Sequence, residues 1–313
     1  MVMKKTRNNP GKCRIFVLGI IPAVLLIPTL VWTSQVMGAP ITFNTALPVA
    51  KGEFVAREQL VVNQSGDDPS GADRDRTEVA AVTALGYGLT GRWALFGVLP
   101  YRDIDLDTIS GGQRITRSNN GFGDLSSFAR YTAYQHDRPG RTFRVAPFVG
   151  VKAPTGSDDK SDRLGTLPAS VQVGSGSWDY FGGVVLIYQT LQYQFDGQLS
   201  YRVNNEANGF AAGDIARLDG SYQHRLWRSG AQGVPDYLYG VMEVNLIHQD
   251  NNRRNGSENP DSGGTQLFLT PGIQYVTKRW ILEGAVQVPV VQDLNGTALE
   301  NDYIVRAGVR FNF

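Results

Sequence analysis

The sequence predicts an all-β protein, a closed antiparallel up-and-down transmembrane β-barrel of about 12 strands. Three observations predict it. After residue 52, apolar and polar side chains alternate over repeated stretches of about ten residues, which is the two-residue period of a β-strand. Twelve such stretches can be assigned, and single-chain bacterial outer-membrane barrels have an even number of strands. The connections between them are alternately tight and long, as they are at the two rims of such a barrel.

The composition excludes several functional classes. The 313 residues carry 30 basic and 29 acidic side chains, a net charge of +1, and a single Cys. The first 38 residues hold five of the basic residues, no acidic residue and that Cys, which leaves 25 basic and 29 acidic residues, a net charge of −4. A chain without a basic excess is not expected to bind nucleic acid. A remainder without Cys excludes disulfide scaffolds, thiol catalysis, Cys-bound zinc and Fe–S clusters.

Residues 1–38 are predicted to be a signal peptide. Five positive charges precede an apolar run over residues 15–32, and the small-residue segment 36–40 follows it. The alternative is a retained membrane anchor, because 18 apolar residues are close to the lower limit for a spanning helix. Pro22 and Pro28 weaken a long helix in that run, which favours the signal peptide.

The signal peptide fixes the predicted domain organisation. Cleavage is expected after Gly38 or Ala39, where the small residues lie. Residues 39–52 are predicted to form a short periplasmic N-terminal segment, and residues 53–313 the barrel. Either a cleaved signal or a retained anchor implies export, so the predicted location is the outer membrane of a Gram-negative bacterium.

The predicted strands follow one another to the end of the chain. They cover residues 53–63, 76–89, 92–105, 123–136, 141–153, 177–189, 192–204, 213–225, 236–249, 264–276, 280–291 and 301–313. The last is the clearest, because apolar residues from Tyr303 to Phe313 share one parity while Arg306 and Arg310 share the other. The first is less clear, since it places Glu58 on the apolar side. The predicted long connections are 64–75, 106–122, 154–176, 205–212, 250–263 and 292–300.

Alternation alone fits a soluble sandwich as well as a membrane barrel, because it does not say which face is inside. The strand count and the connection lengths favour the barrel. So do aromatic residues near strand ends, where interfacial girdles lie; they are Trp93, Trp178, Trp227, Trp280, Tyr101, Tyr180, Tyr188, Tyr237 and Tyr303. The expected partners are therefore outer-membrane lipids and lipopolysaccharide. The terminal Phe313 resembles the signal that the outer-membrane assembly machinery reads.

Several segments together resemble the outer-membrane "transporter" family named for the meta-pathway of phenol degradation. The resemblance covers roughly residues 120–313 and rests on the order and spacing of short Gly-rich motifs. These are Gly121 to Leu125, Lys152 to Lys160, Gly174 to Tyr180, Asp261 to Gly264, and Val288 to Gly296 leading into Leu299 to Tyr303. The resemblance implies an outer-membrane β-barrel that helps to move small, often aromatic or hydrophobic, compounds. It supplies no catalytic residues.

The charged parity of the strands supplies the candidate pore-lining residues. These are Arg130, Arg202, Arg217, Asp219, Arg225, Glu243, Glu283, Arg306 and Arg310. Twelve strands lie between small barrels filled by side chains and large porins with open channels. The charges would therefore line a narrow polar channel that selects solutes. The alternative is that they pair with one another and fill the lumen, because unpaired charge in a confined space is costly.

The sequence predicts neither a metal site nor a catalytic one. The predicted outer loops are rich in Asp and could hold Ca²⁺, but no spacing matches a defined Ca²⁺ loop, which favours solvated loops. The histidines, His136, His224 and His248, lie on different predicted strands. No Gly-Xaa-Ser-Xaa-Gly elbow, phosphate loop or paired-His motif is present, so no cofactor is expected and the chain is predicted not to be an enzyme. An outer-membrane hydrolase would need a hydroxyl nucleophile near His248.

The predicted function is a porin-like outer-membrane channel or transporter for small molecules, gated by its outer loops. The alternative is a structural or surface-interaction barrel with a sealed lumen and cation-binding loops.

Overall fold

The computed structural model describes residues 38–230 and 234–313. The predicted signal peptide, except for Gly38, lies outside the described residues. No helix in the described ranges is long and apolar enough to cross a membrane.

The described chain forms a closed antiparallel barrel of twelve strand positions, which confirms the predicted fold class. One position is divided among three strands, β4, β5 and β6. The strands are β1 (Phe54–Ser65), β2 (Asp75–Gly88), β3 (Trp93–Ser110), β4 (Gln113–Phe122), β5 (Leu125–Tyr131), β6 (Tyr134–Arg138), β7 (Arg141–Ala153), β10 (Asp179–Thr190), β11 (Tyr193–Val203), β13 (Ile215–Arg228), β14 (Tyr237–Gln249), β17 (Gly264–Val276), β18 (Trp280–Leu294) and β19 (Tyr303–Asn312). Pairing of β1 with β19 closes the ring.

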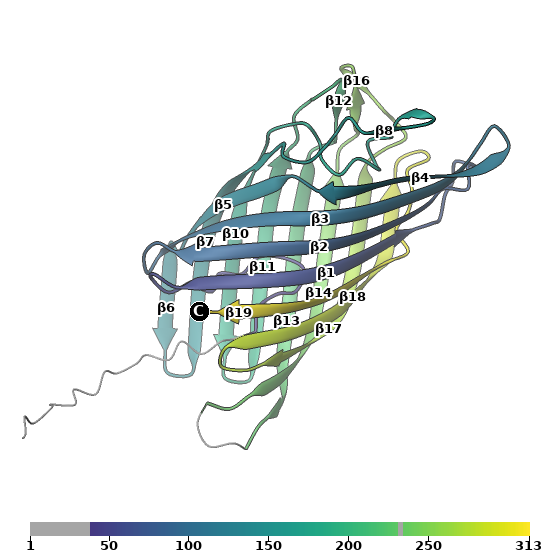
Figure 1. The fold of residues 1–313 in the computed structure, drawn as a ribbon. Coiled ribbons are helices and arrows are strands. Elements are labelled where there is room, and N and C mark those ends of the chain that lie inside the picture. The colour runs from purple at the N-terminus through teal and green to yellow at the C-terminus, as the bar shows by residue number, and fades with distance from the viewer. Residues whose placement is uncertain (1–37, 231–233) are drawn as a thin grey trace, which may run out of the picture. The chain divides into compact units, whose positions relative to one another are not determined.

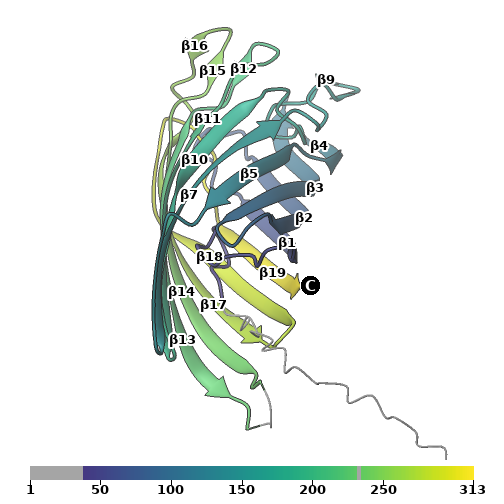
Figure 2. The same cartoon turned by 90° about the vertical axis from the view of Figure 1, so that its left-hand side faces the viewer.

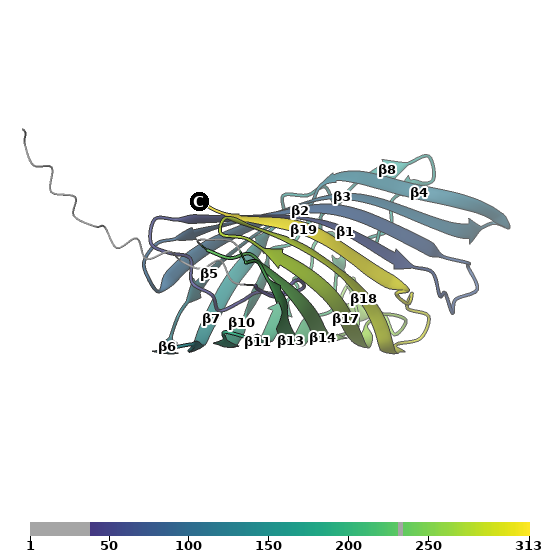
Figure 3. The same ribbon diagram turned by 90° about the horizontal axis from the view of Figure 1, so that it is seen from below.

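Two views show how the sheet wraps around. In Figure 1, β1, β2 and β3 cross in front of β10, β11, β13 and β14. From below, the same two sets of strands form opposite sides of the molecule (Figure 3). Closure removes free sheet edges and satisfies the backbone groups between neighbouring strands, as a hydrocarbon environment requires.

The two faces of the strands differ as the alternation predicts. Along β14, Val241, Glu243 and Asn245 point inward and are buried, while Met242 and Val244 are exposed on the outside. Because the outer face is apolar and the inner face is polar, the hydrophobic residues of this fold form mainly a surface for lipid rather than a core. Glu58 is on the outer face, where the Thr83 hydroxyl donates to its carboxylate at 2.7 Å.

The fourth strand position departs from the sequence prediction. Residues 106–122 were expected to be a loop, and this expectation is wrong, because β3 continues to Ser110 and β4 returns along it. Gly111 and Gly112 turn the chain with φ values of 58° and 78°, a conformation that favours glycine. The hairpin was missed because β4 is rich in Ser and Asn, which are typical of loops.

The remaining connections gather at two ends. The long loops lie together at one end, with the short strands β8 (Ser161–Asp162), β9 (Gly165–Thr166), β12 (Phe210–Ala211), β15 (Arg253–Arg254) and β16 (Ser257–Glu258) among them (Figure 2). The short turns lie at the other end. This arrangement matches the expected extracellular and periplasmic rims.

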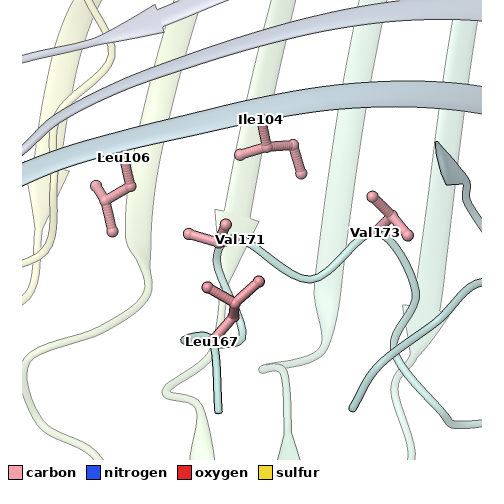
Figure 4. Close-up of a cluster of buried hydrophobic side chains, with 5 residues drawn as sticks. All are labelled: Ile104, Leu106, Leu167, Val171 and Val173. Carbon is pink, nitrogen blue, oxygen red and sulfur yellow. The ribbon is translucent and has the colours of Figure 1, made fainter. Parts of the chain in front are cut away.

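One long loop folds back over the inner face of β3. Leu167, Val171 and Val173 of the connection between β7 and β10 pack against Ile104 and Leu106 in a buried apolar cluster (Figure 4). Burying these five side chains against each other removes apolar surface from water, which holds the loop in place. The long-loop end of the lumen is therefore partly covered.

Candidate functional site: the lumen of the barrel

A cavity of about 1290 Å³ lies inside the barrel toward the long loops. Apolar side chains from β1, β2 and β3 form one part of its wall, including Val61, Val82 and Val98. Basic side chains from other strands form another part, including Arg202 of β11 and Arg306 of β19. The cavity is therefore amphipathic, with an apolar side and a positively charged side.

Arg202 and Arg306 are two basic side chains of the barrel strands that line this cavity without a carboxylate partner. The Arg306 guanidinium donates to Gln287 Oε1 at 2.7 Å and to Gln59 Oε1 at 3.1 Å. The Arg202 guanidinium carbon lies 5.6 Å from the centre of the Phe181 ring. In the part of the chain that the structure describes, no carboxylate oxygen lies within 4.0 Å of either guanidinium. Both cations are thus free to attract an anion.

Two other basic side chains of the cavity wall, Arg102 and Lys152, are paired with carboxylates. Arg102 Nε donates to Glu78 Oε1 at 2.7 Å. Lys152 Nζ lies 3.3 Å from Asp124 Oδ2 and also contacts the Asp179 carboxylate. These ion pairs join neighbouring strands, or a strand and a loop, in the barrel wall. Because each positive charge has a negative partner, they contribute less to the electric field in the cavity than Arg202 and Arg306.

The N-terminal segment 38–47 lies inside the barrel. The Glu243 carboxylate of β14 accepts from Ile41 N at 2.7 Å, from Thr42 N at 3.0 Å and from the Thr42 hydroxyl. One carboxyl group thus accepts from two consecutive backbone N–H groups and a hydroxyl, which anchors the segment to β14. The sequence predicts a short periplasmic segment over residues 39–52, and the first part of that segment contacts inward-facing side chains of the barrel.

Two arginines hold the carbonyl groups of the same segment. Arg130 of β5 donates to Asn44 Oδ1 at 2.9 Å and also to the carbonyls of Thr45 and Leu47. Arg57 of β1 donates to Ile41 O at 2.6 Å. The arginine hydrogen bonds satisfy backbone groups that no strand pairs with, which explains how an irregular segment can be buried here.

Apolar contacts anchor the segment on two sides of the lumen. Ile41 packs with Val241 of β14 and Ala285 of β18. At the other side, Ala46 is fully buried in a cluster with three side chains of β7 and β10; they are Ala146, Val185 and Ile187. The segment therefore crosses the lumen from one wall toward the other.

The structure distributes the predicted pore-lining residues over three environments. Arg202 and Arg306 line the cavity. Arg130 and Glu243 bind the N-terminal segment. Paired groups form the third set: Arg217 with Asp219 at 2.9 Å, and Arg310 with Glu283 at 3.5 Å.

Arg225 lies apart from the other predicted residues. Its guanidinium donates to Gln192 Oε1 at 2.9 Å and lies 5.5 Å from the Tyr237 ring centre, near the short-turn end. It therefore takes no part in the cavity or in binding the N-terminal segment. Sequence reasoning missed Arg57 and Gln59, which face inward from β1. Placing Glu58 and Leu60 firmly on the outer face would have found them, because strand neighbours alternate.

Three of the motifs that carried the family resemblance meet in space. The Asp124 carboxylate accepts from Gly156 N and from Ser175 N, both at 2.9 Å. Gly174 N donates to Ser157 O at 3.0 Å. The motifs thus form a clasp, defined by Asp124, Gly156 and Gly174. The clasp fixes the loop between β7 and β10 to the barrel wall at the junction of β4 and β5.

Substituting Gly174→Ala is expected to loosen this clasp. A Cβ on Gly174 would lie 2.7 Å from the Gly156 Cα, and backbone cannot yield as a flexible side chain can. Overpacking of this kind costs about 1–3 kcal/mol. The midpoint of heat-dependent gel migration should fall for this variant. Gly220→Ala is the matched control, because nothing lies within 4 Å of its added Cβ; equal midpoints for the two variants would contradict the clasp.

Asp68 and Asp162 of the loops are paired with arginines. Arg74 Nε donates to Asp68 Oδ1 at 2.9 Å, and the Arg74 guanidinium holds the pKa of Asp68 well below its usual range. Arg117 Nε donates to Asp162 Oδ2 at 2.8 Å. Within residues 38–230 and 234–313, no three His, Cys, Asp or Glu side chains gather as a metal site would require. Both carboxylates are thus bound to arginine.

His248 has polar partners on both ring nitrogens. Nδ1 lies 2.8 Å from the Thr265 hydroxyl, and Nε2 lies 3.5 Å from Asp250 Oδ1. The group is exposed at the long-loop end of β14 and β17, away from the lumen. The hydroxyl next to His248 belongs to Thr265. Because His248 lies outside the lumen, the lumen is kept as the candidate functional site.

The lumen can now be compared with known proteins. A family model described as "Putative MetA-pathway of phenol degradation" matches residues 72–288. The chain belongs to that family. The match confirms the resemblance noted in the sequence and includes most of the strands that form the cavity. No curated protein sequence matches the chain.

A solved outer-membrane barrel has the same fold. The COG4313 outer membrane channel from Pseudomonas putida F1 is 13% identical, with 88% of this chain and 100% of that chain covered and a TM-score of 0.65. The NanC porin is 14% identical over 82% of this chain and 98% of its own, with a TM-score of 0.42. At these identities the likeness concerns the fold, and the first of the two supports an outer-membrane barrel.

Proposed function

We propose that this family member is an outer-membrane channel through which small molecules pass, with the lumen as the conduit and the long loops as its outer gate. The observation that carries the proposal is the cavity of about 1290 Å³ inside a closed barrel, with Arg202 and Arg306 unpaired in its wall. A structural barrel would gain stability by pairing or replacing these cations, because charge without a partner in a confined site is costly. Keeping them suits a site that attracts a passing anion.

The wall suggests the class of solute. Val61, Val82 and Val98 can contact an apolar body, while the two guanidinium groups can hold a carboxylate through charge-assisted hydrogen bonds. A small organic acid with an aromatic or aliphatic body has both features. This proposal refines the expectation of small aromatic or hydrophobic compounds by adding a negative charge.

The proposed location is the outer membrane, with lipid and lipopolysaccharide around the apolar outer face. Phe313 is placed suitably for recognition by the assembly machinery: its backbone pairs with Phe54 at 2.7 and 3.0 Å, while its side chain is 67% exposed. Signal-directed export of the chain belongs to the same proposal.

Liposome swelling tests the solute class. Vesicles containing the purified protein should swell faster in benzoate than in an uncharged aromatic alcohol of similar size, since Arg202 and Arg306 lower the barrier for the anion. Benzylammonium should enter more slowly than both. Equal rates for the three solutes, or faster entry of the cation, would contradict the proposed preference.

The runner-up is a barrel whose lumen is sealed. The N-terminal segment that crosses the lumen favours this alternative, because it occupies space that a solute would need. With a sealed barrel, vesicles would not swell in any of the three solutes. With a channel that has no charge preference, they would swell at equal rates in all three.

A further inference from the structure

Two buried carbonyl oxygens without a hydrogen-bond donor face Gly38. They belong to the side chains of Gln223 on β13 and Gln274 on β17, and both side chains are 0% exposed. A Cβ on Gly38 would lie 2.9 Å from Gln274 Oε1 and closer still to Gln223 Oε1. Buried acceptors are nearly always satisfied, and leaving one unsatisfied costs about 1–3 kcal/mol. The pair therefore points to a missing donor next to Gly38.

A buried carboxylate without a cation lies at the same place. Asp196 of β11 is 5% exposed, and no Lys or Arg nitrogen of the described residues lies within 4.0 Å of it. Gln194 Nε2 donates both to Asp196 Oδ2 at 2.6 Å and to Gly38 O at 3.0 Å. Gln223 Nε2 also donates to Asp196 Oδ2, at 3.4 Å. Gln194 thus links the carboxylate to Gly38, and Gln223 links it to one of the two unsatisfied carbonyls.

A primary ammonium group has the chemistry that this site lacks. It carries one positive charge to balance Asp196 and three N–H donors, which matches the carboxylate and the two carbonyl oxygens. Burying an ion in this way is tolerable only if the charge is paired and the donors are satisfied. The described lysines are not placed here, and an α-ammonium group at a chain terminus would supply both the charge and the donors.

We infer that the chain is hydrolysed between Gly38 and Ala39, and that the new α-ammonium group of Ala39 binds to Gln223, Gln274 and Asp196. Hydrolysis by a processing peptidase adds one water across the peptide bond, which leaves a carboxylate on Gly38 and an amine on Ala39 that takes up a proton. Departure of the Gly38 residue frees the space that the ammonium group needs. The site is an internal binding site for the mature N-terminus.

The contacts favour this bond over the next one. Cleavage after Gly38 removes one acceptor, Gly38 O, which accepts from Gln194 Nε2 at 3.0 Å. Cleavage after Ala39 would remove a second one as well, Ala39 O, which accepts from Gln274 Nε2 at 2.6 Å. It would also leave Pro40 with a secondary ammonium group, which has two donors for three acceptors. Only the cut chain supplies the cation for Asp196, whereas the hydrogen bonds of Glu243, Arg130 and Arg57 to the segment form in either chain.

The first test identifies the terminus. The full chain is expressed with its own leader in a Gram-negative host and purified from outer membranes, and its N-terminal peptide is sequenced by mass spectrometry. The expected terminus is Ala39. A terminus at Pro40, at any other residue, or a chain that is not cleaved would overturn the inference.

The second test asks whether the α-amine is held. The folded protein is treated with formaldehyde and cyanoborohydride, and methylation of the α-amine is compared with that of exposed Lys51 in the same sample. The α-amine should react at least about tenfold more slowly than Lys51, because it is reached only when the segment opens. Asp196→Asn and Gln223→Met should each remove this protection. An α-amine that reacts as fast as Lys51 in the unmodified chain, or that stays protected in both variants, would overturn the inference.

The matched control is Gln189→Met. Gln189 of β10 is also buried in the lumen with an unsatisfied carbonyl oxygen, but it has no hydrogen bond to residues 38–47. Protection should persist in this variant, and its loss would overturn the assignment of the site to Gln223 and Asp196. Heat-dependent gel migration establishes that each variant is folded. None of these measurements depends on conduction by the barrel. The inference can therefore fail while the proposed channel function holds, and the channel function can fail while the inference holds.

Discussion

Deleting residues 39–47 is expected to raise the single-channel conductance several-fold. The segment crosses the lumen between β14 and β7, and Glu243 and Arg130 hold it there by hydrogen bonds to its backbone. Without it, water and ions replace its backbone and side chains, so the narrowest part of the conduit widens. Recording in planar bilayers at fixed salt concentration measures the change.

A second variant separates the presence of the segment from its anchoring. Glu243→Gln keeps the segment but replaces one of the two oxygens that accept from its backbone N–H groups with an NH₂ group that only donates, so the segment should dock less firmly. Its conductance should switch between the level of the unmodified protein and that of the deletion variant. If the deletion variant folds, as shown by heat-dependent gel migration, yet conducts like the unmodified protein, the segment does not obstruct the conduit.

Reversing the charge of Arg202 and Arg306 is expected to change the channel from anion-selective to cation-selective. The double variant Arg202→Glu/Arg306→Glu replaces two positive charges of the cavity wall by two negative ones. Because both guanidinium groups lack carboxylate partners in the described chain, the substitutions break no ion pair there. The reversal potential across a salt gradient should change sign.

Arg92→Glu/Arg141→Glu is the control for charge alone. Both residues are exposed near the short-turn end and do not line the cavity. This variant should keep the selectivity of the unmodified protein. A reversal potential that shifts equally in both double variants would show that total charge, rather than the cavity wall, sets the selectivity.

The strands could be predicted because their environment imposes a strict period. Val305, Arg306 and Ala307 alternate between lipid and lumen, so the inward position of Arg306 follows from the alternation alone. The same reasoning placed Glu243 and Glu283 inside. The alternation could not predict which inward charges lack an ion-pair partner. Arg310 pairs with Glu283 on the neighbouring strand, whereas Arg306 donates only to the amide oxygens of Gln287 and Gln59.

The inserted N-terminal segment could not be predicted from its own sequence. Residues 38–47 have no strand or helix period, and their structure is set by partners far away in the chain: Thr42 lies 201 residues from Glu243. The β3–β4 hairpin was not predicted for a related reason. The Asn and Ser residues of β4 have a low intrinsic preference for strands, and their strand conformation is stabilised by pairing with β3. A sequence period predicts contacts that repeat along a strand. A single contact between residues far apart in the chain, such as that of Thr42 with Glu243, produces no such period.

The central claim is that the lumen conducts, and single-channel recording of the unmodified protein in a planar bilayer tests it most directly. We predict discrete current steps with a reversal potential that favours anions. A folded barrel that inserts into the bilayer and passes no current would contradict the claim and favour the sealed barrel.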